Sequence, residues 1–219
     1  MFLVGSYNGS IDFGGGKLLA SSGGDTDLFV ARLDQTTGEH VWSQGFGDAQ
    51  ANQSPTSRNS IAVTNGRLVV AGDFLGTLDF GSGPMKSAGA EDIYLAHFDP
   101  AGGLVFARSF GDTGSDILGS VAVDSAGGIT MVGHFHGTTT FGQSTSVSAG
   151  GYDAFFAKYL ATSAPVWVHS FGDASDQRAY SVALDYQGNA LITGEFSGTI
   201  NFGGTPLLGP GMYLVKESP

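Results

Sequence analysis

The chain has 219 residues, no cysteine and a formal net charge of −11 at pH 7. The absence of cysteine excludes disulfides, thiolate catalysis and zinc sites built on cysteine. Because an acidic surface repels phosphate backbones, we expect no nucleic-acid partner. Glycine contributes 36 residues while 41% of the residues are hydrophobic, which is typical of a turn-rich globular protein with a buried core.

The chain lacks the features of a membrane segment. No apolar run reaches the roughly 18 residues of a membrane span. Met1 leads directly into the strand-like run FLVGSY, without a basic segment and an apolar signal core. We therefore expect no membrane span, and if the protein is exported, its signal lies outside this chain.

Strand-like runs follow one another along the chain. The first three are FLVGSY, DLFVARLD and EHVWSQGF, and the next four are SIAVT, RLVVAGDF, DIYLAHFD and GLVFARSF. The four after these are SVAVD, ITMVGHF, DAFFAKYL and APVWVHSF, and the last three are SVALD, ALITGEF and MYLVKES. Each run is rich in β-branched and aromatic residues, and none has the apolar spacing of a helix. We expect helix to be nearly absent.

Two markers recur with one period. The phrase GDFLGTLDFGSG at Gly72 returns as GHFHGTTTFGQS, GEFSGTINFGGT and GSYNGSIDFGGG, at Gly133, Gly194 and Gly5. Its opening glycines are 67, 61 and 61 residues apart, and the phenylalanines of the phrase FGD are 64 and 61 residues apart. Two markers with a shared spacing indicate tandem repeats.

Four-stranded repeats with periodic glycine and aromatic residues predict an all-β fold, a β-propeller built from blades of about 61 residues. We expect one domain, 1–219, with about three and a half blades. Blade 1 (1–47) lacks the inner strand, blades 2 (59–111) and 3 (119–172) are complete, and blade 4 (180–219) lacks the outer strand.

Residues at two positions of the repeat are predicted to have structural roles, and we call the residues that share one position a column. The aromatic column is expected to pack between blades and comprises Trp42, Phe46, Phe106, Phe110, Trp167 and Phe171. The aspartates that open the third strand of each repeat, Asp27, Asp92 and Asp153, are expected to hold a turn or an interblade hydrogen bond.

The repeat resembles a known family. The stretch SFGDASDQRAYSVALDYQGNALITGEFSGTINFGG from Ser170, with DLFVARLD from Asp27, is similar to SBBP-type β-propeller repeats of exported bacterial proteins. The GTxDFGGG form resembles long repeat proteins of myxobacteria. The resemblance implies a secreted or cell-surface, envelope-associated bacterial protein, and it implies no shared reaction or ligand.

Related NHL-type propellers imply that the AVDxxG run is innermost and the GxxxW run outermost. If the strands of each blade are lettered A to D from the innermost to the outermost, the four successive repeats of this chain contain strands BCD, ABCD, ABCD and ABC. Such a chain either closes as a compact four-bladed ring, belongs to a longer propeller or is completed by other chains. Because ABC and BCD cannot merge into one blade, we favour further blades from a longer parent chain or another chain over a seven-bladed dimer.

The loops at the D-to-A and B-to-C connections are the first candidate site. Asp73, His134 and Glu195 follow the opening glycines and form either a polar ring at the channel mouth or solvated strand ends. His134 and His136 share one face of a strand, a spacing that chelates Zn²⁺, Ni²⁺ or Cu²⁺ if a third ligand such as Glu195 is present.

The acidic loops are the second candidate. Asp112 and Asp116 in GDTGSD, and Asp173 and Asp176 in GDASD, offer carboxylates that suit Ca²⁺. No loop has the D-x-D-x-D-G spacing of dedicated calcium loops. The alternative is that Asp48, Asp112 and Asp173 accept backbone hydrogen bonds and hold turns. We expect no cofactor, with Ca²⁺ as the open alternative.

The sequence contains no G-x-S-x-G elbow between a strand and a helix, and no P-loop. We therefore expect a non-enzymatic exported scaffold or recognition module that binds protein or carbohydrate through these loops. One alternative is a structural subunit of an envelope or filament assembly that uses open blade edges. The other is a metal-assisted hydrolase or lyase on the same loops.

Overall fold

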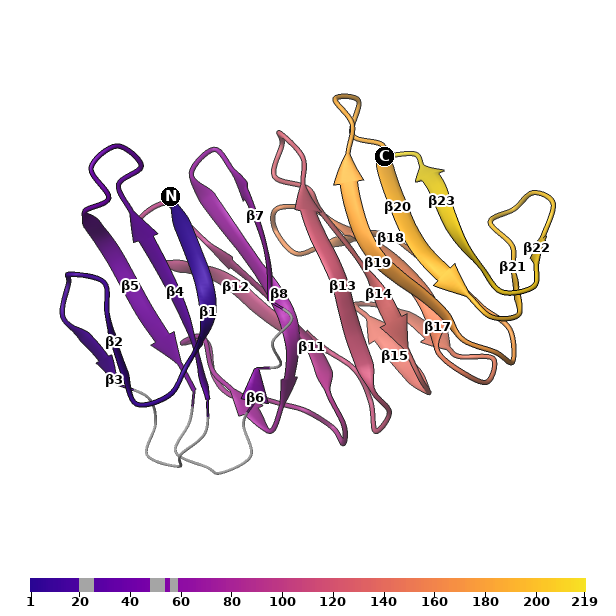
Figure 1. Ribbon diagram of the computed structural model, residues 1–219, viewed down its shortest axis with the longest axis horizontal. Helices are drawn as coiled ribbons and strands as arrows, with labels where there is room; N and C mark the ends of the chain where they lie inside the picture. Colours follow the sequence, from indigo (N-terminus) through magenta and orange to yellow (C-terminus); the bar gives the residue numbers. More distant parts are fainter. Residues whose placement is uncertain (20–25, 48–53, 56–58) are drawn as a thin grey trace.

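The computed structural model describes residues 1–19, 26–47, 54–55 and 59–219. This part of the chain is built from strands and turns without a helix, so the expected all-β class is confirmed. It accordingly has no helix with the length and apolar character to cross a membrane. The strands form successive antiparallel sheets that follow one another in chain order along the long axis of the molecule (Figure 1).

The long strands form four sheets, which we number in chain order. Sheet 1 contains β1 (Phe2–Tyr7), β4 (Asp27–Leu33) and β5 (His40–Phe46). Sheet 2 contains β6 (Ser54–Pro55), β7 (Ser60–Thr64), β8 (Arg67–Leu75), β11 (Asp92–Phe98) and β12 (Leu104–Phe110). Sheet 3 contains β13 (Asp116–Val123), β14 (Ile129–Phe135), β17 (Asp153–Tyr159) and β18 (Pro165–Phe171). Sheet 4 contains β19 (Gln177–Leu184), β20 (Ala190–Phe196) and β23 (Gly211–Glu217).

The repeated GTxxFG phrase forms small hairpins, although the sequence had indicated a plain connection. The hairpins are β2 (Ser10–Asp12) with β3 (Lys17–Leu19), β9 (Thr77–Leu78) with β10 (Met85–Lys86), β15 (Thr138–Phe141) with β16 (Ser144–Val147), and β21 (Thr199–Ile200) with β22 (Leu207–Leu208). Their strands are so short that the sequence pattern alone does not reveal them.

The hairpin turns explain why the phrase keeps its glycines. Asp79 Oδ1 accepts hydrogen bonds from the amides of Gly81 and Gly83 at 2.7 and 3.1 Å. Both glycines have positive φ angles, 101° and 110°, which side chains with a Cβ rarely adopt. The recurrence of this part of the phrase is therefore a requirement of the turn.

The FGD loops and the hairpins lie at the same end of the sheets, as expected. In sheet 3, Phe135 at the end of β14 pairs with Asp116 and Asp153, where β13 and β17 begin. The end of β18 is adjacent, because Phe171 pairs with Ala154. We call this end of the sheets the loop end.

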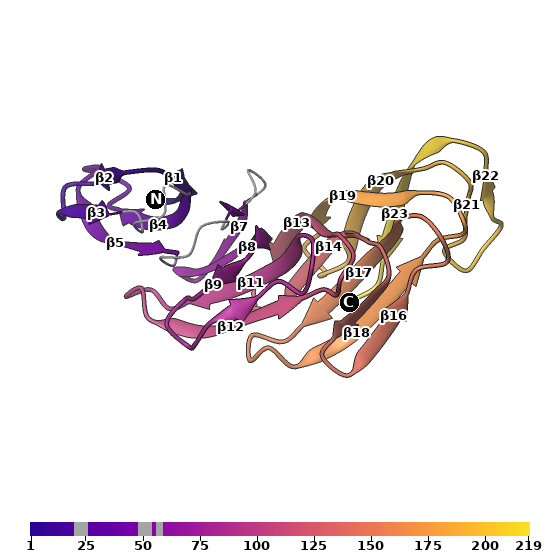
Figure 2. The ribbon, with the colours of Figure 1, turned by 90° about the horizontal axis from the view of Figure 1, so that it is seen from below.

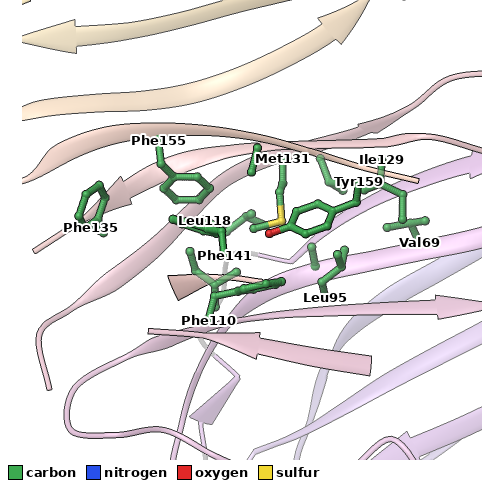
Figure 3. Packing of buried hydrophobic residues seen from close by; sticks show 14 residues of the cluster. Val69, Leu95, Phe110, Leu118, Ile129, Met131, Phe135, Phe141, Phe155 and Tyr159 are labelled. Atoms are coloured by element: carbon green, nitrogen blue, oxygen red, sulfur yellow. The ribbon is translucent and has the colours of Figure 1, made fainter. Parts of the chain in front are cut away.

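Neighbouring sheets are joined by side chains from alternate strand positions. Val69 and Leu95 from sheet 2 share one buried cluster with Ile129, Met131 and Tyr159 from sheet 3 (Figure 3). Equivalent clusters join sheet 1 to sheet 2 and sheet 3 to sheet 4. Because successive side chains of a strand point to opposite faces, each inner sheet contributes to two clusters.

The aromatic column also connects sheets. The FGD phenylalanine of each of sheets 1 to 3 contacts a phenylalanine in the hairpin of the following sheet, with ring centroids 4.8–5.6 Å apart, in the pairs Phe46–Phe80, Phe110–Phe141 and Phe171–Phe202. Trp42, Phe106 and Trp167 pack against the edges of the same clusters. The side chains of this column thus pack against the clusters that join neighbouring sheets.

The strands at one edge of the sheets approach one another closely. β13 contacts both β7 and β19. The register of β13 shifts between Leu118 and Ser120, so Gly119 bulges out of the pairing with β14. A Cβ on Gly119 would lie 2.3 Å from the Ala179 carbonyl oxygen, which means that only glycine fits this contact.

The four sheets form an open row. Sheets 1 and 4 lie at opposite ends of the molecule in both views, and the row bends into an arc in Figure 2. Of the alternatives left by the sequence, a compact four-membered ring is therefore not the arrangement of this chain.

Replacing Gly119 by alanine tests the close approach of β13 and β19. Because the new Cβ would meet backbone, we expect a loss of about 1–3 kcal/mol of stability and a fall in Tm of roughly 5 °C, measured by thermal denaturation. Gly204→Ala is the matched control, since a Cβ on Gly204 would meet no other part of the chain within 4 Å. Equal Tm values for the two variants would contradict the close contact.

Candidate functional site

The column after the opening glycines joins sheets together. Asp73 is completely buried, and its carboxylate accepts a hydrogen bond from the Leu118 amide on β13 of the next sheet. His134 has the same position in sheet 3, is also buried, and faces Tyr180 of β19 with ring centroids 6.3 Å apart. The interpretation as solvated strand ends is therefore wrong for Asp73 and His134.

Polar and aromatic side chains gather at the loop end where sheets 3 and 4 meet. The Arg178 guanidinium stacks on Tyr152, with Cζ 5.0 Å from the ring centroid. It donates hydrogen bonds to Asp176 Oδ2 at 2.7 Å and to Glu195 Oε1 at 3.3 Å. The Tyr180 hydroxyl donates to the same Glu195 oxygen at 2.5 Å. We call this group the 3–4 cluster: His134, Tyr152, Asp176, Arg178, Tyr180 and Glu195.

A β-bulge presents Tyr180 to solvent. The register of β19 shifts between Ala179 and Ser181, so Tyr180 stands outside the pairing with β20 and is 42% exposed. Bulges often redirect a side chain at the edge of a sheet. Tyr180 lines a hollow of about 380 Å³ between the edge strands β7, β13 and β19, together with Asn59, Ser60, Leu118 and Gly119.

The 3–4 cluster has no counterpart between sheets 2 and 3. The equivalent positions there hold a different set of side chains, namely Glu91, Ser115, Ile117 and Gly119 where the cluster has Tyr152, Asp176, Arg178 and Tyr180. The Ser115 hydroxyl donates to Glu91 Oε2 at 2.9 Å. Sequence analysis missed Tyr152, Arg178 and Tyr180 because it looked for residues that recur. The signal that would have found them is the change from Gly119 to Tyr180 at the same place in the repeat.

The cluster combines an aromatic face with charged groups that already bond one another. Burial raises the pKa of Tyr180, and the hydrogen bond to Glu195 raises it further, so the hydroxyl remains a donor at neutral pH. One guanidinium and two carboxylates surround this phenol. The arrangement suits a ligand with several hydroxyl groups and one apolar face.

The acidic loops hold the hairpins in place. Asp112 accepts hydrogen bonds from the Gly114 amide in its own loop and from the Thr138 amide in the following hairpin, both at 2.7 Å. Asp173 makes the equivalent pair of bonds in the next repeat. These contacts are the turn-holding role that the sequence analysis weighed against calcium.

The second carboxylates of these loops differ from each other. Asp116 is buried and accepts hydrogen bonds from the Asp112 amide and the Thr139 hydroxyl. Its counterpart in the next repeat is Gln177, which bonds Asp173, whereas Asp176 belongs to the 3–4 cluster. Asp48, in the first loop of this series, lies outside the described residues.

The expected histidine pair is only partly buried. His134 lies inside the sheet, His136 is exposed just after β14, and both rings approach Tyr152 edge-on, with centroids 5.1 and 6.0 Å from it. Among the residues that the structure describes, no group of three or more His, Cys, Asp or Glu side chains could hold a metal ion.

The aspartates that open the third strands pack against the glycine of FGD. A Cβ on Gly47, Gly111 or Gly172 would lie 2.2–2.5 Å from the carboxylate of Asp27, Asp92 or Asp153. The contact explains why Asp and Gly recur together. Burial raises the pKa of Asp92 to about 7 and that of Asp153 to about 6. In each of these two, Oδ2 accepts an amide hydrogen bond while Oδ1 has no hydrogen-bond partner among the described residues.

Comparisons with known proteins give no match to this sequence. No protein-family model matches the sequence, and no curated protein matches it. The resemblance to SBBP-type repeats therefore stays a prediction.

Asp73→Ala tests the bond between sheets 2 and 3. The substitution leaves the buried Leu118 amide without its acceptor, so we expect a loss of about 1–3 kcal/mol of stability in urea denaturation. Glu195→Ala, at the same repeat position but nearly half-exposed, is expected to cost less than about 1 kcal/mol. A loss from Asp73→Ala no larger than that from Glu195→Ala would show that the bond adds nothing.

Asp92→Asn tests the pH dependence. The pKa of Asp92 in the folded protein lies above the ~3.9 of an unfolded aspartate, so ionisation destabilises the fold as the pH rises between these values. Asparagine keeps an acceptor for the Ala88 amide without ionising. We expect the stability of the variant relative to the native chain to increase from about pH 4 to about pH 7 and to level off above that, in urea titrations.

The control for this pH experiment is Asp12→Asn, on an exposed hairpin turn. A change in stability that both variants share would come from the substitution itself rather than from burial of the carboxyl group. A curve for Asp92→Asn that runs parallel to that of the native chain would rule out the buried carboxyl as the source of pH dependence.

Proposed function

We propose that this chain is a segment of a β-propeller and that sheets 1 to 4 are about three and a half of its blades. Three features support the proposal: the sheets pack face to face, the edge strands β7, β13 and β19 lie in contact, and the loops share one end. The similarity of the repeat to SBBP-type sequences supports a secreted or envelope-associated bacterial location.

We further propose that the protein is a non-enzymatic recognition module that binds carbohydrate at the 3–4 cluster. The observation that carries this proposal is the exposed Tyr180 ring beside hydrogen-bonded Arg178 and Glu195. Sugars present apolar C–H faces that stack on aromatic rings, and hydroxyl groups that bond carboxylates and guanidinium groups. Tyrosine supplies both a rigid apolar face and a polar hydroxyl.

The size of the hollow favours a saccharide over a protein surface. Its volume, about 380 Å³, is in the range of small-ligand sites, which is roughly 300–1,000 Å³. A protein partner requires a much larger contact, of about 800 Å² on each side. Asn59 and Ser60 add hydrogen-bonding groups across the hollow from Tyr180.

Tyr180→Ala tests the saccharide site. We expect the native chain to bind members of an array of neutral and acidic oligosaccharides, and the variant to bind the same members roughly tenfold more weakly or not at all, as measured by calorimetry. Tyr186→Ala is the matched control, because Tyr186 is 96% exposed in the turn between β19 and β20 of the same sheet.

Two outcomes would overturn the saccharide proposal. One is the absence of binding to every member of the array. The other is a saccharide that Tyr180→Ala binds as tightly as the native chain does, which would place the site elsewhere. Conversion of a bound saccharide to products would replace the non-enzymatic proposal with the hydrolase or lyase alternative.

A further inference from the structure

Sheet 4 exposes a row of large apolar side chains on the face that points away from sheet 3. Met212 and Leu214 of β23 are 83% and 70% exposed, and Leu191 of β20 is 37% exposed. The register of β20 and β23 places the three on one face, since Leu191 pairs with Lys216 and alternate residues share a face. We call this surface, formed by Leu191, Met212 and Leu214, the open face.

The same positions are buried in every other sheet. Met212 and Leu214 correspond to pairs that are completely buried against the following sheet: Leu28 and Val30, Ile93 and Leu95, and Ala154 and Phe156. Three internal interfaces therefore show what covers such a face, namely the opposite face of another sheet of the same repeat.

Sheet 1 presents that opposite face at the other end of the molecule. Leu3 and Phe29 occupy the positions of Val70 and Tyr94, which receive sheet 1 in the first internal interface. Val70 and Tyr94 are completely buried, whereas Leu3 and Phe29 are partly exposed and Met1 is 54% exposed. The receiving face of sheet 1 is thus also uncovered.

We propose that the open face of sheet 4 packs against the receiving face of sheet 1 of a second copy of this chain. The contact continues the internal interfaces, with intact three-stranded sheets stacked face to face. It therefore does not require two partial sheets to merge into one. The proposal does not rest on the saccharide site, but the two surfaces adjoin, because Glu195 of the 3–4 cluster pairs with Met212 and shares the open face.

A polar contact of the internal interfaces is available at this junction as well. The Arg32 guanidinium of sheet 1 donates a hydrogen bond to the Pro100 carbonyl in the turn of sheet 2. Lys216 occupies the position of Arg32 in sheet 4, and Gln35 occupies that of Pro100 in sheet 1. The Lys216 ammonium donates to Asp185 Oδ2 at 2.9 Å within its own copy, and its position would let a second N–H donate to the Gln35 carbonyl of the next copy.

Association of this kind joins the head of one copy to the tail of another. Such a heterologous contact uses two different surfaces, so each added copy leaves one open face and one receiving face free. The products are closed rings when the rotation per copy completes a circle, and filaments when it does not.

The experiment is light scattering of the 219-residue chain across a hundredfold dilution. We expect the native chain to associate in a concentration-dependent manner. Leu214→Glu should raise the midpoint concentration roughly tenfold or more, since it places a charge in the apolar contact. Val166→Glu is the control: Val166 is 48% exposed on β18 of sheet 3, away from both faces, and its variant should associate like the native chain.

The chain has no cysteine, so the direction of the contact is measurable by cross-linking. We expect a mixture of the Met212→Cys and Leu3→Cys chains to give mixed disulfide dimers, in excess over dimers of either variant alone. A native chain that stays monomeric at every concentration would overturn the proposal. Equal association of the Leu214→Glu chain, or preferential Met212→Cys homodimers, would overturn it too.

Discussion

The packing of one sheet on the next is the interaction on which the rest of this structure depends. A sheet of three or four short strands cannot bury both of its faces by itself, so each must be covered by a neighbour. Alternate side chains from the two central strands fill the space between sheets, as Leu95 and Met131 do between sheets 2 and 3. The period of about 61 residues is the length of chain needed to build one such layer and pass to the next.

The same constraint explains the polar residues that recur. Close packing of layers leaves backbone amides buried at their contacts, and each requires an acceptor. Asp73 supplies one to the Leu118 amide, and Asp112 supplies two at the loop end. The repeated carboxylates thus hold layers and turns together. The burial that this requires raises the pKa values of Asp92 and Asp153.

Two places in the structure differ from the equivalent positions of the other repeats. At Gly119 the edge strands touch, whereas Tyr180 at the same place projects from its bulge beside Arg178 and Glu195. Met212 and Leu214 are exposed in the part of the chain that the structure describes, whereas Ile93 and Leu95 at the same positions are buried by the next layer. The first place has a polar hollow with an aromatic wall, and the second has exposed apolar side chains.

The sequence by itself determined the strands, their order, the common loop end and the packing role of Phe46 and Phe110, because these follow from local alternation and from a repeated period. It predicted a turn or an interblade hydrogen bond for Asp27, Asp92 and Asp153, and it did not predict their contact with the glycine of FGD. Only the tertiary structure decided that Asp73 and His134 are buried and that Arg178 meets both Tyr152 and Glu195. The physical reason is that burial and side-chain partners depend on the neighbouring layer, which the alternation of residues within one strand does not describe.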